Sequence, residues 1–169
     1  MTSIVSSLSV TQIRSLSTTM IANLTTEDVA ALSTTQVKAL SAAQIAAIQT
    51  EDFAVLSTDQ ISAIASTSIS GLSLDQLAVL ETAKMSSLAT TQIAAMSATQ
   101  IGGLSTDQID VLDSRQISVL SSAQLAALAS DDIATFSNDE IAAISAKSLA
   151  GLSTGSIAGL STDQATALT

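Results

Sequence analysis

Two rows of apolar residues, each repeating every eight residues without insertion or deletion, constrain the fold of this chain more than any other feature. The first row runs from Leu8 to Leu168, and the second runs five residues after it, from Ile13 to Ile157. Unbroken phase of this kind is typical of repeat proteins in which each unit packs on its neighbours. We therefore predict a single repeat domain over residues 1–169, built from about twenty octads between residues 8 and 168.

The octad Leu104 to Val111 shows why one continuous helix is a poor solution. Its two apolar residues, Leu104 and Ile109, are five positions apart, whereas Ile109 and Leu112 are three apart. On an α-helix, residues three apart share a face, but residues five apart point about 140° away from each other. Each octad is therefore expected to form its own short helix, with a break between Leu104 and Ile109.

Hydroxyl residues at the second and third octad positions predict where each helix begins. Ser105 is followed three residues later by Gln108, the pattern of a capping box in which each side chain binds the other residue's backbone amide. The same pattern recurs at Ser33–Gln36, Ser41–Gln44, Ser57–Gln60, Ser97–Gln100 and Ser121–Gln124. Where the second position is alanine, as at Ala89 and Ala129, the third residue is expected to cap instead. The alternative for the glutamines is a ladder of hydrogen bonds between molecules.

Acidic and small residues agree with short, closely packed helices. Twelve of the fifteen acidic residues lie at the fourth or fifth octad position, in the first helical turn, where they complement the helix dipole. Helices this short are unstable alone, so packing between octads must stabilise them. The eighth position is nearly always small, for example at Gly71, Gly103 and Gly151, which would let neighbouring backbones approach closely.

The predicted fold class is all-α, a solenoid of very short capped helices, one per octad. Alternate octads differ in charge, with acids such as Asp59 and Asp75 in one set and Lys84, Arg115 and Lys147 in the other. This alternation favours two helices per coil, so that a coil is two octads long, and three octads per coil remains open. The alternative fold is a β-solenoid, since Ile, Val and Thr suit strands, but the six glycines keep no regular phase for tight turns.

The composition excludes most kinds of chemistry. The net charge of −10 disfavours binding to nucleic acid and to anionic membrane surfaces. The chain has no histidine or cysteine, no glycine-rich phosphate loop and no Gly-x-Ser-x-Gly motif. We therefore expect no enzyme activity, no catalytic residues, no cofactor and no metal site, and no membrane insertion, because no apolar run approaches the length of a membrane span.

Two minor alternatives follow from the repetition itself. Acids one coil apart, such as Asp59 and Asp75, could share a calcium ion, although calcium requires six to eight oxygen ligands and the known calcium loops are absent. Threonine pairs such as Thr18-Thr19, Thr34-Thr35 and Thr90-Thr91 suggest an ice-binding array, but the fourth octad position varies too widely to keep that array regular.

Tandem Leu-Ser/Thr-Thr-x-Gln-Ile/Val-x-Ala units, such as Leu32 to Ala39, Leu56 to Ala63 and Leu104 to Val111, resemble octapeptide repeats of large bacterial surface or secreted adhesin-like proteins. The resemblance covers nearly the whole chain. It implies an extracellular or cell-surface structural role and carries no catalytic residues. Met1 to Ser9 lacks the basic and apolar segments of a classical signal peptide, and no anchor or binding head is expected in the chain.

The resulting functional hypothesis is a structural repeat protein that binds copies of itself. A stack of repeats normally needs polar end caps, yet the octads at Leu8 and Leu160 resemble the interior ones, so exposed coils could join molecules into filaments or a layer. The alternative is a protein-interaction module or adhesin spacer, with another protein bound at a face marked by Lys84, Arg115 and Lys147.

Overall fold

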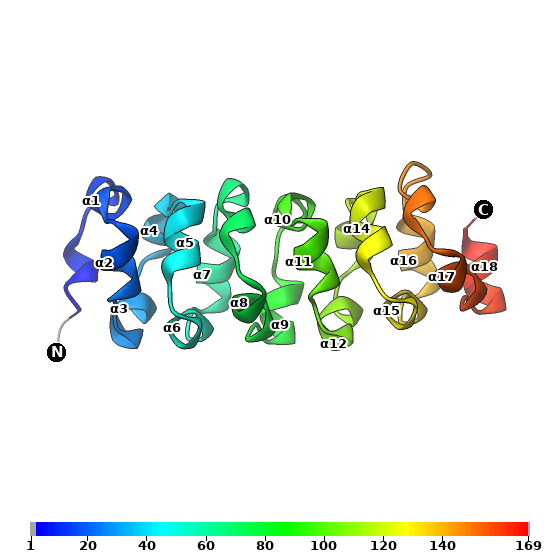
Figure 1. The fold of residues 1–169 in the computed structure, drawn as a ribbon, viewed down its shortest axis with the longest axis horizontal. Helices are drawn as coiled ribbons and strands as arrows, with labels where there is room; N and C mark the ends of the chain where they lie inside the picture. The colour runs from blue at the N-terminus through cyan, green and yellow to red at the C-terminus, as the bar shows by residue number, and fades with distance from the viewer. Residues whose placement is uncertain (1–2, 169) are drawn as a thin grey trace. The chain divides into compact units, whose positions relative to one another are not determined.

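The computed structural model describes residues 3–168, and every regular element within that range is a short helix (Figure 1). The predicted helical solenoid with one short helix per octad is confirmed, and the alternative β-solenoid is contradicted. The chain divides into two compact units, Met1–Leu80 and Glu81–Thr169. The octad phase does not change at this division, because Leu80 and Leu88 keep the step of eight. The single repeat domain over residues 1–169 stays a prediction.

The helices of the two units have nearly the same length and phase. In the first unit they are η1 Val5–Ser7, α1 Val10–Ser15, α2 Thr18–Ala22, α3 Thr26–Ala30, α4 Thr34–Ala39, α5 Ala42–Ala47, α6 Thr50–Ala54, α7 Thr58–Ala63, η2 Ser66–Gly71 and α8 Leu74–Ala78. In the second they are α9 Thr82–Ser86, α10 Thr90–Ala95, α11 Ala98–Gly102, α12 Thr106–Asp110, α13 Ser114–Ser118, α14 Ser122–Ala127, α15 Ser130–Ala134, α16 Asn138–Ala143, η3 Leu149–Gly151, α17 Thr154–Ala158 and α18 Thr162–Ala167.

Each octad is a capped helix followed by two extended residues. The Ser105 hydroxyl accepts a hydrogen bond from the Gln108 backbone N–H at 3.3 Å, and the Gln108 Oε1 accepts one from the Ser105 N–H at 3.0 Å. The predicted capping box is therefore present. At the other end, the Leu112 N–H donates to the Ile109 carbonyl at 3.1 Å. The first octad residue is typically extended, as is the N-cap serine after it, and this pair turns the chain into the next helix.

The prediction for octads that lack a hydroxyl at the second position is wrong. At α10 and α15 the N-caps are still Ala89 and Ala129, and no side chain accepts from the first turn. Half of the capping box survives, because the Gln92 Oε1 accepts from the Ala89 N–H at 2.8 Å and an Asp132 carboxylate oxygen accepts from the Ala129 N–H at 2.9 Å. The fifth octad residue therefore fixes the helix start even without a capping hydroxyl.

Three octads form one coil of each unit. In the first unit α1, α4 and α7 pack into one column, α2, α5 and η2 into a second, and α3, α6 and α8 into a third. In the second unit the columns are α9, α12, α15 and α17, then α10, α13, α16 and α18, then α11, α14 and η3. The predicted two-octad coil is corrected to the three-octad coil that the sequence left open. The acids that suggested two octads are exposed, so their alternation does not report on packing.

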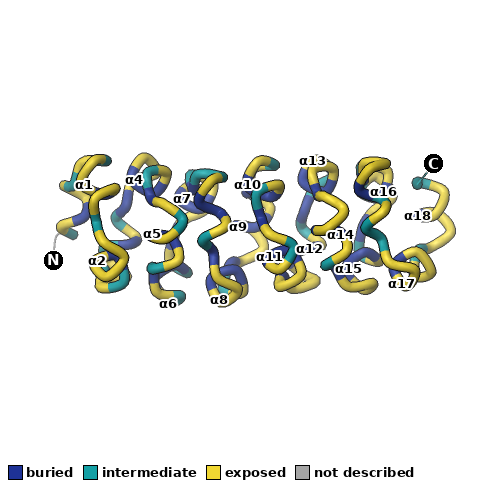
Figure 2. Tube along the Cα trace, turned by 45° about the horizontal axis from the view of Figure 1, so that its top comes forward, coloured by how far each residue is buried: buried dark blue, intermediate teal, exposed yellow. Residues whose placement is uncertain are grey.

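The two apolar rows form the core of each unit. The second row is buried from Ile13 to Ile141, and the first row is buried from Leu32 to Ile144. Phe53 and Phe136 lie in these rows and are buried, as expected for core residues. Figure 2 shows the result along the trace, where buried segments recur in every octad between exposed helical turns. The outer surface is left to Ser, Thr, Ala and the acidic residues.

Candidate functional site

A buried row of glutamines joins successive coils within each unit. The Gln44 Nε2 donates to the carbonyl oxygens of Ile13 and Leu16, both at 2.9 Å, while its Oε1 accepts from the Ser41 N–H. Ile13 and Leu16 lie where the chain leaves α1 and enters α2, the helix that packs against α5. One side chain therefore starts its own helix and also binds the end of a helix in the preceding coil.

The same bridge recurs at a fixed spacing in both units. Each of these glutamines binds the carbonyl of the first residue of the octad three before its own, and also a carbonyl at the end of the helix that precedes that residue. The partners are Val5 and Leu8 for Gln36, Val29, Ala30 and Leu32 for Gln60, Ile45 and Ile48 for Gln76, Met85, Ser86 and Leu88 for Gln116, Ile93 and Met96 for Gln124, and Ala134 and Phe136 for Gln164. The carbonyl of the first octad residue, such as that of Leu16, would otherwise lack a donor, which is costly when buried, whereas that of Ile13 already accepts from the Leu16 N–H.

Serine replaces glutamine at three points, Ser68, Ser148 and Ser156, and at the first two the coils approach more closely. Ser68 and Ser148 donate their hydroxyls to the carbonyls of Leu40 and Leu120, at 2.7 and 2.6 Å. A serine side chain is shorter than glutamine, so its octad must lie nearer to the coil below. A Cβ added to Gly71 would overlap the Ala42 carbonyl oxygen. Gly151 has the same relation to Ser122, so the predicted close approach at small eighth residues is confirmed at these two glycines.

Acidic residues at the fifth position make a different contact between coils. Asp52 and Asp132 accept hydrogen bonds from the hydroxyls of Thr26 and Thr106, at 2.5 and 2.8 Å. Within residues 3–168, no three acidic side chains gather closely enough to hold a metal ion. Since a coil has three octads, the two-octad spacing that placed Asp59 and Asp75 on adjacent coils is wrong, and the calcium hypothesis loses its geometric basis.

The first and last coils leave parts of this coil-to-coil interface uncovered. In the first coil Gln12 is exposed, and within residues 3–168 its Nε2 donates to no acceptor, although its Oε1 accepts from the Ser9 N–H. Ile4 and Met20, at the same octad position, are 75% and 54% exposed. In the last coil Ile157 is 52% exposed, whereas interior members of its row are buried.

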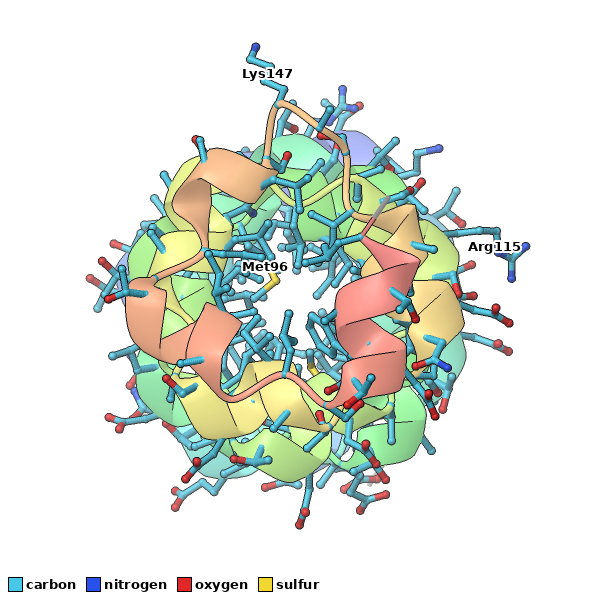
Figure 3. The ribbon with its side chains drawn as sticks, turned by 90° about the vertical axis from the view of Figure 1, so that its right-hand side faces the viewer. Met96, Arg115 and Lys147 are labelled. Carbon is cyan, nitrogen blue, oxygen red and sulfur yellow. The ribbon has the colours of Figure 1, made fainter. Side chains whose placement is uncertain are left out.

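The three cations predicted to mark a binding face do not form one. Lys84 is buried, while Arg115 and Lys147 project from the outer surface in different directions, and Met96 points into the interior (Figure 3). Arg115 is paired with Asp113 at 2.9 Å. The N–H of Gln116 and the Arg115 side chain together hold the pKa of Asp113 below its ordinary value. The surface predicted for another protein at Lys84, Arg115 and Lys147 is therefore not a contiguous patch.

The repeat also matches a known repeat family. The family model described as the ALTTAQ repeat matches residues 21–48, 45–82 and 77–114. These matches span residues 21–114, which is 94 of 169 residues and more than half of the chain. The chain belongs to the ALTTAQ repeat family. An ALTTAQ unit corresponds here to segments such as Ala31 to Gln36, which include the capping serine and the bridging glutamine. The predicted tandem-repeat character is thus confirmed.

No curated protein matches the chain. Among the helices of residues 3–168, none combines the length and the apolar character that a bilayer crossing requires. The sites that stand out in the described chain are therefore the bridges and the uncovered coils.

Proposed function

We propose that this protein is a non-enzymatic structural repeat protein that assembles end to end into filaments or a surface layer by stacking of solenoid coils. The observation that carries the proposal is the glutamine bridge. Within each unit, successive coils bind one another through the same amides, carbonyls and apolar rows, so a further coil of the same kind has a surface to bind.

The uncovered coils present two unlike halves of this interface. The first coil offers amide and apolar side chains, and the last coil offers carbonyl oxygens and apolar side chains. A contact between unlike faces of identical molecules does not close on itself unless its rotation forms a ring, and it otherwise grows into an open filament. Assembly by this route requires no binding partner other than copies of the chain.

The non-enzymatic part of the proposal rests on the chemistry that the side chains offer. The chain has no histidine or cysteine. Its bridging residues are neutral amides and hydroxyls whose hydrogen bonds are made within the fold. An extracellular or cell-surface location and an adhesin-like setting are proposed from the resemblance of the octads to surface-protein repeats.

Light scattering combined with negative-stain electron microscopy tests this function. We expect the scattering mass to rise with protein concentration and the images to show unbranched filaments of variable length. Val119→Asp is a suitable control, since Val119 lies on the outer surface of an interior coil and is only partly exposed. A monodisperse monomer at high concentration would refute the proposal.

A further inference from the structure

We infer that a second copy of this chain binds with its first coil on the last coil of its neighbour, in one register, through Ile4, Gln12 and Met20. This inference rests on the proposed function and goes further, because it names the contacts that form the junction. Its starting observation is the fifth octad position, which in the interior reaches the preceding coil.

The fifth position is unusual in the first coil. Most interior octads carry buried Gln, Ser, Asp or Lys there, but Ile4 and Met20 are large apolar residues, and both are more than half exposed. Exposed apolar side chains at positions that elsewhere contact another coil indicate an apolar partner. Gln12 lies between them and has an amide Nε2 without an acceptor in the described chain.

The last coil holds three sets of carbonyls in the places that bridging residues bind elsewhere. The two carbonyls that Gln124 binds lie 31 and 28 residues before it in the sequence. Continuing the same spacing for three octads after Gln164 reaches three pairs of carbonyls, which are Ile141 and Ile144, Leu149 and Leu152, and Ile157 and Leu160. Within residues 3–168, no side chain donates a hydrogen bond to any of these six carbonyls. Three fifth-position residues of one copy thus face three sets of acceptors on the other.

Matching the two series in order gives Gln12 a chemically suitable polar partner, whereas Ile4 and Met20 donate no hydrogen bond and offer apolar contacts only. Gln12 would donate to the carbonyls of Leu149 and Leu152, as Gln124 donates to Ile93 and Met96 within the chain. This places α1 of the incoming copy on α17 and α2 on α18, which continues the columns of the second unit.

The same register places Ile4 and Met20 against apolar side chains of the other copy. Ile4 falls at the corner formed by Ile141 and Ile144, where the structure has a hollow of about 170 Å³ that is also lined by Leu149 and Leu168. Met20 falls at the corner of Ile157, the most exposed member of its row. The junction therefore continues the coil-to-coil interface and covers three exposed apolar side chains.

Association of single variants measures the contribution of each contact. Met20→Asp and Ile4→Asp should each weaken association about tenfold or more, because each places a charge in an apolar contact. Gln12→Glu should also weaken it, since a carboxylate would face two carbonyls, while its Oε1 can still cap the Ser9 N–H. Val119→Asp should leave association unchanged, and in dilute solution all four variants should keep the wild-type helical spectrum.

Chemical crosslinking tests the register directly, because the natural chain has no cysteine. Met20→Cys and Ile157→Cys proteins are prepared separately and treated with a short bismaleimide. A mixture of the two should give covalent dimers, and neither protein alone should. A mixture of Val55→Cys with Ile157→Cys is the control for random collision.

The outcomes separate this inference from the proposed function. If the wild type assembles but association ignores the three variants and no mixed dimer forms, the register is wrong and self-assembly stands. Dimers in the Met20→Cys sample alone would show a symmetric contact and would also overturn the register. A wild type that stays monomeric would overturn both.

Discussion

The amide of a bridging glutamine joins two helices that are far apart in sequence. In Gln124, Oε1 accepts from the Ser121 N–H and Nε2 donates to the carbonyls of Ile93 and Met96, so all of its polar atoms are used. Among the described residues, no buried side-chain nitrogen or oxygen lacks a hydrogen-bond partner. Polar atoms in such a position stabilise the fold mainly because leaving their partners unsatisfied is costly.

Gln124→Ala should therefore destabilise the protein by about 2 to 4 kcal/mol, since it leaves the Met96 carbonyl and the Ser121 N–H without partners, while the Ile93 carbonyl keeps the Met96 N–H. Gln12→Ala is the matched control, because Gln12 caps its helix but makes no bridge within the described chain. That change should cost about 1 kcal/mol or less in dilute solution. Urea unfolding followed by circular dichroism measures both, and equal losses would mean that the bridges contribute no stability.

Glu140 occupies the fifth octad position, but its side chain cannot form the bridge that glutamine forms there. It caps its helix through the Ser137 N–H at 2.8 Å, but an ionised carboxylate cannot donate to the carbonyls of Ile109 and Leu112, which the glutamine spacing places opposite it. Glu140→Gln supplies the missing donor and should stabilise the fold by about 1 kcal/mol. An unchanged or lower urea midpoint would contradict this assignment.

Asp113 makes stability depend on acid pH. Hydrogen bonds from the Gln116 N–H and from Arg115 lower its pKa below the ordinary value of 3.8 in the folded state. The folded state therefore prefers the ionised carboxylate. This contribution is complete above the ordinary pKa and is lost as pH falls through the lower folded-state value. Asp113→Asn should flatten the loss of stability between about pH 5 and pH 2, as followed by thermal melts; an unchanged slope would argue against it.

At the scale of the helix, capping and packing determine different features of the structure. The serine and the fifth residue fix where each helix starts, and the apolar rows fix which side faces the core. The α-helices are too short to persist alone, so each one depends on the helices three octads before and after it in its unit. Where the bridging residue is Ser68 or Ser148, the stacked helices approach so closely that only glycine fits at the eighth octad position.

The glycines beside Ser68 and Ser148 test this dependence on spacing. Gly151→Ala should destabilise the second unit by about 2 kcal/mol or more, because its Cβ would overlap the Ser122 carbonyl and the backbone would have to move. Gly159→Ala is the control, since its Cβ would meet only ordinary contacts at 3.4 Å or more. A thermal melt in which both variants behave alike would show that the close approach is not required.

The short capped helices could be predicted from the sequence, whereas the bridges between coils could not, for a physical reason. Ser105, Gln108 and the apolar rows predict capped helices because all three signals act within one octad. The partner of a glutamine Nε2 lies several octads away, so it can be identified only when the coil length is known. That length could not be obtained from Asp59, Asp75 or Arg115, because exposed charges do not take part in packing.

At the scale of the molecule, both units are built from one interface that is used repeatedly. The apolar rows, the bridges and the columns of helices recur from coil to coil, and this regularity makes continuation into a second molecule possible. The sequence predicted exposed coils as the place of function. The structure adds the unlike chemistry of the two coils, with Ile4, Gln12 and Met20 on one and open carbonyls beside Ile157 on the other.

Sedimentation equilibrium over a wide range of concentrations tests end-to-end assembly most directly. The wild type should show a mean mass that rises above the 17.0 kDa monomer without reaching a plateau, as open-ended growth requires. The double variant Ile4→Asp with Met20→Asp should remain a monomer over the same range, with unchanged helical content. A wild type that keeps the monomer mass throughout, or that stops at a dimer, would contradict the account.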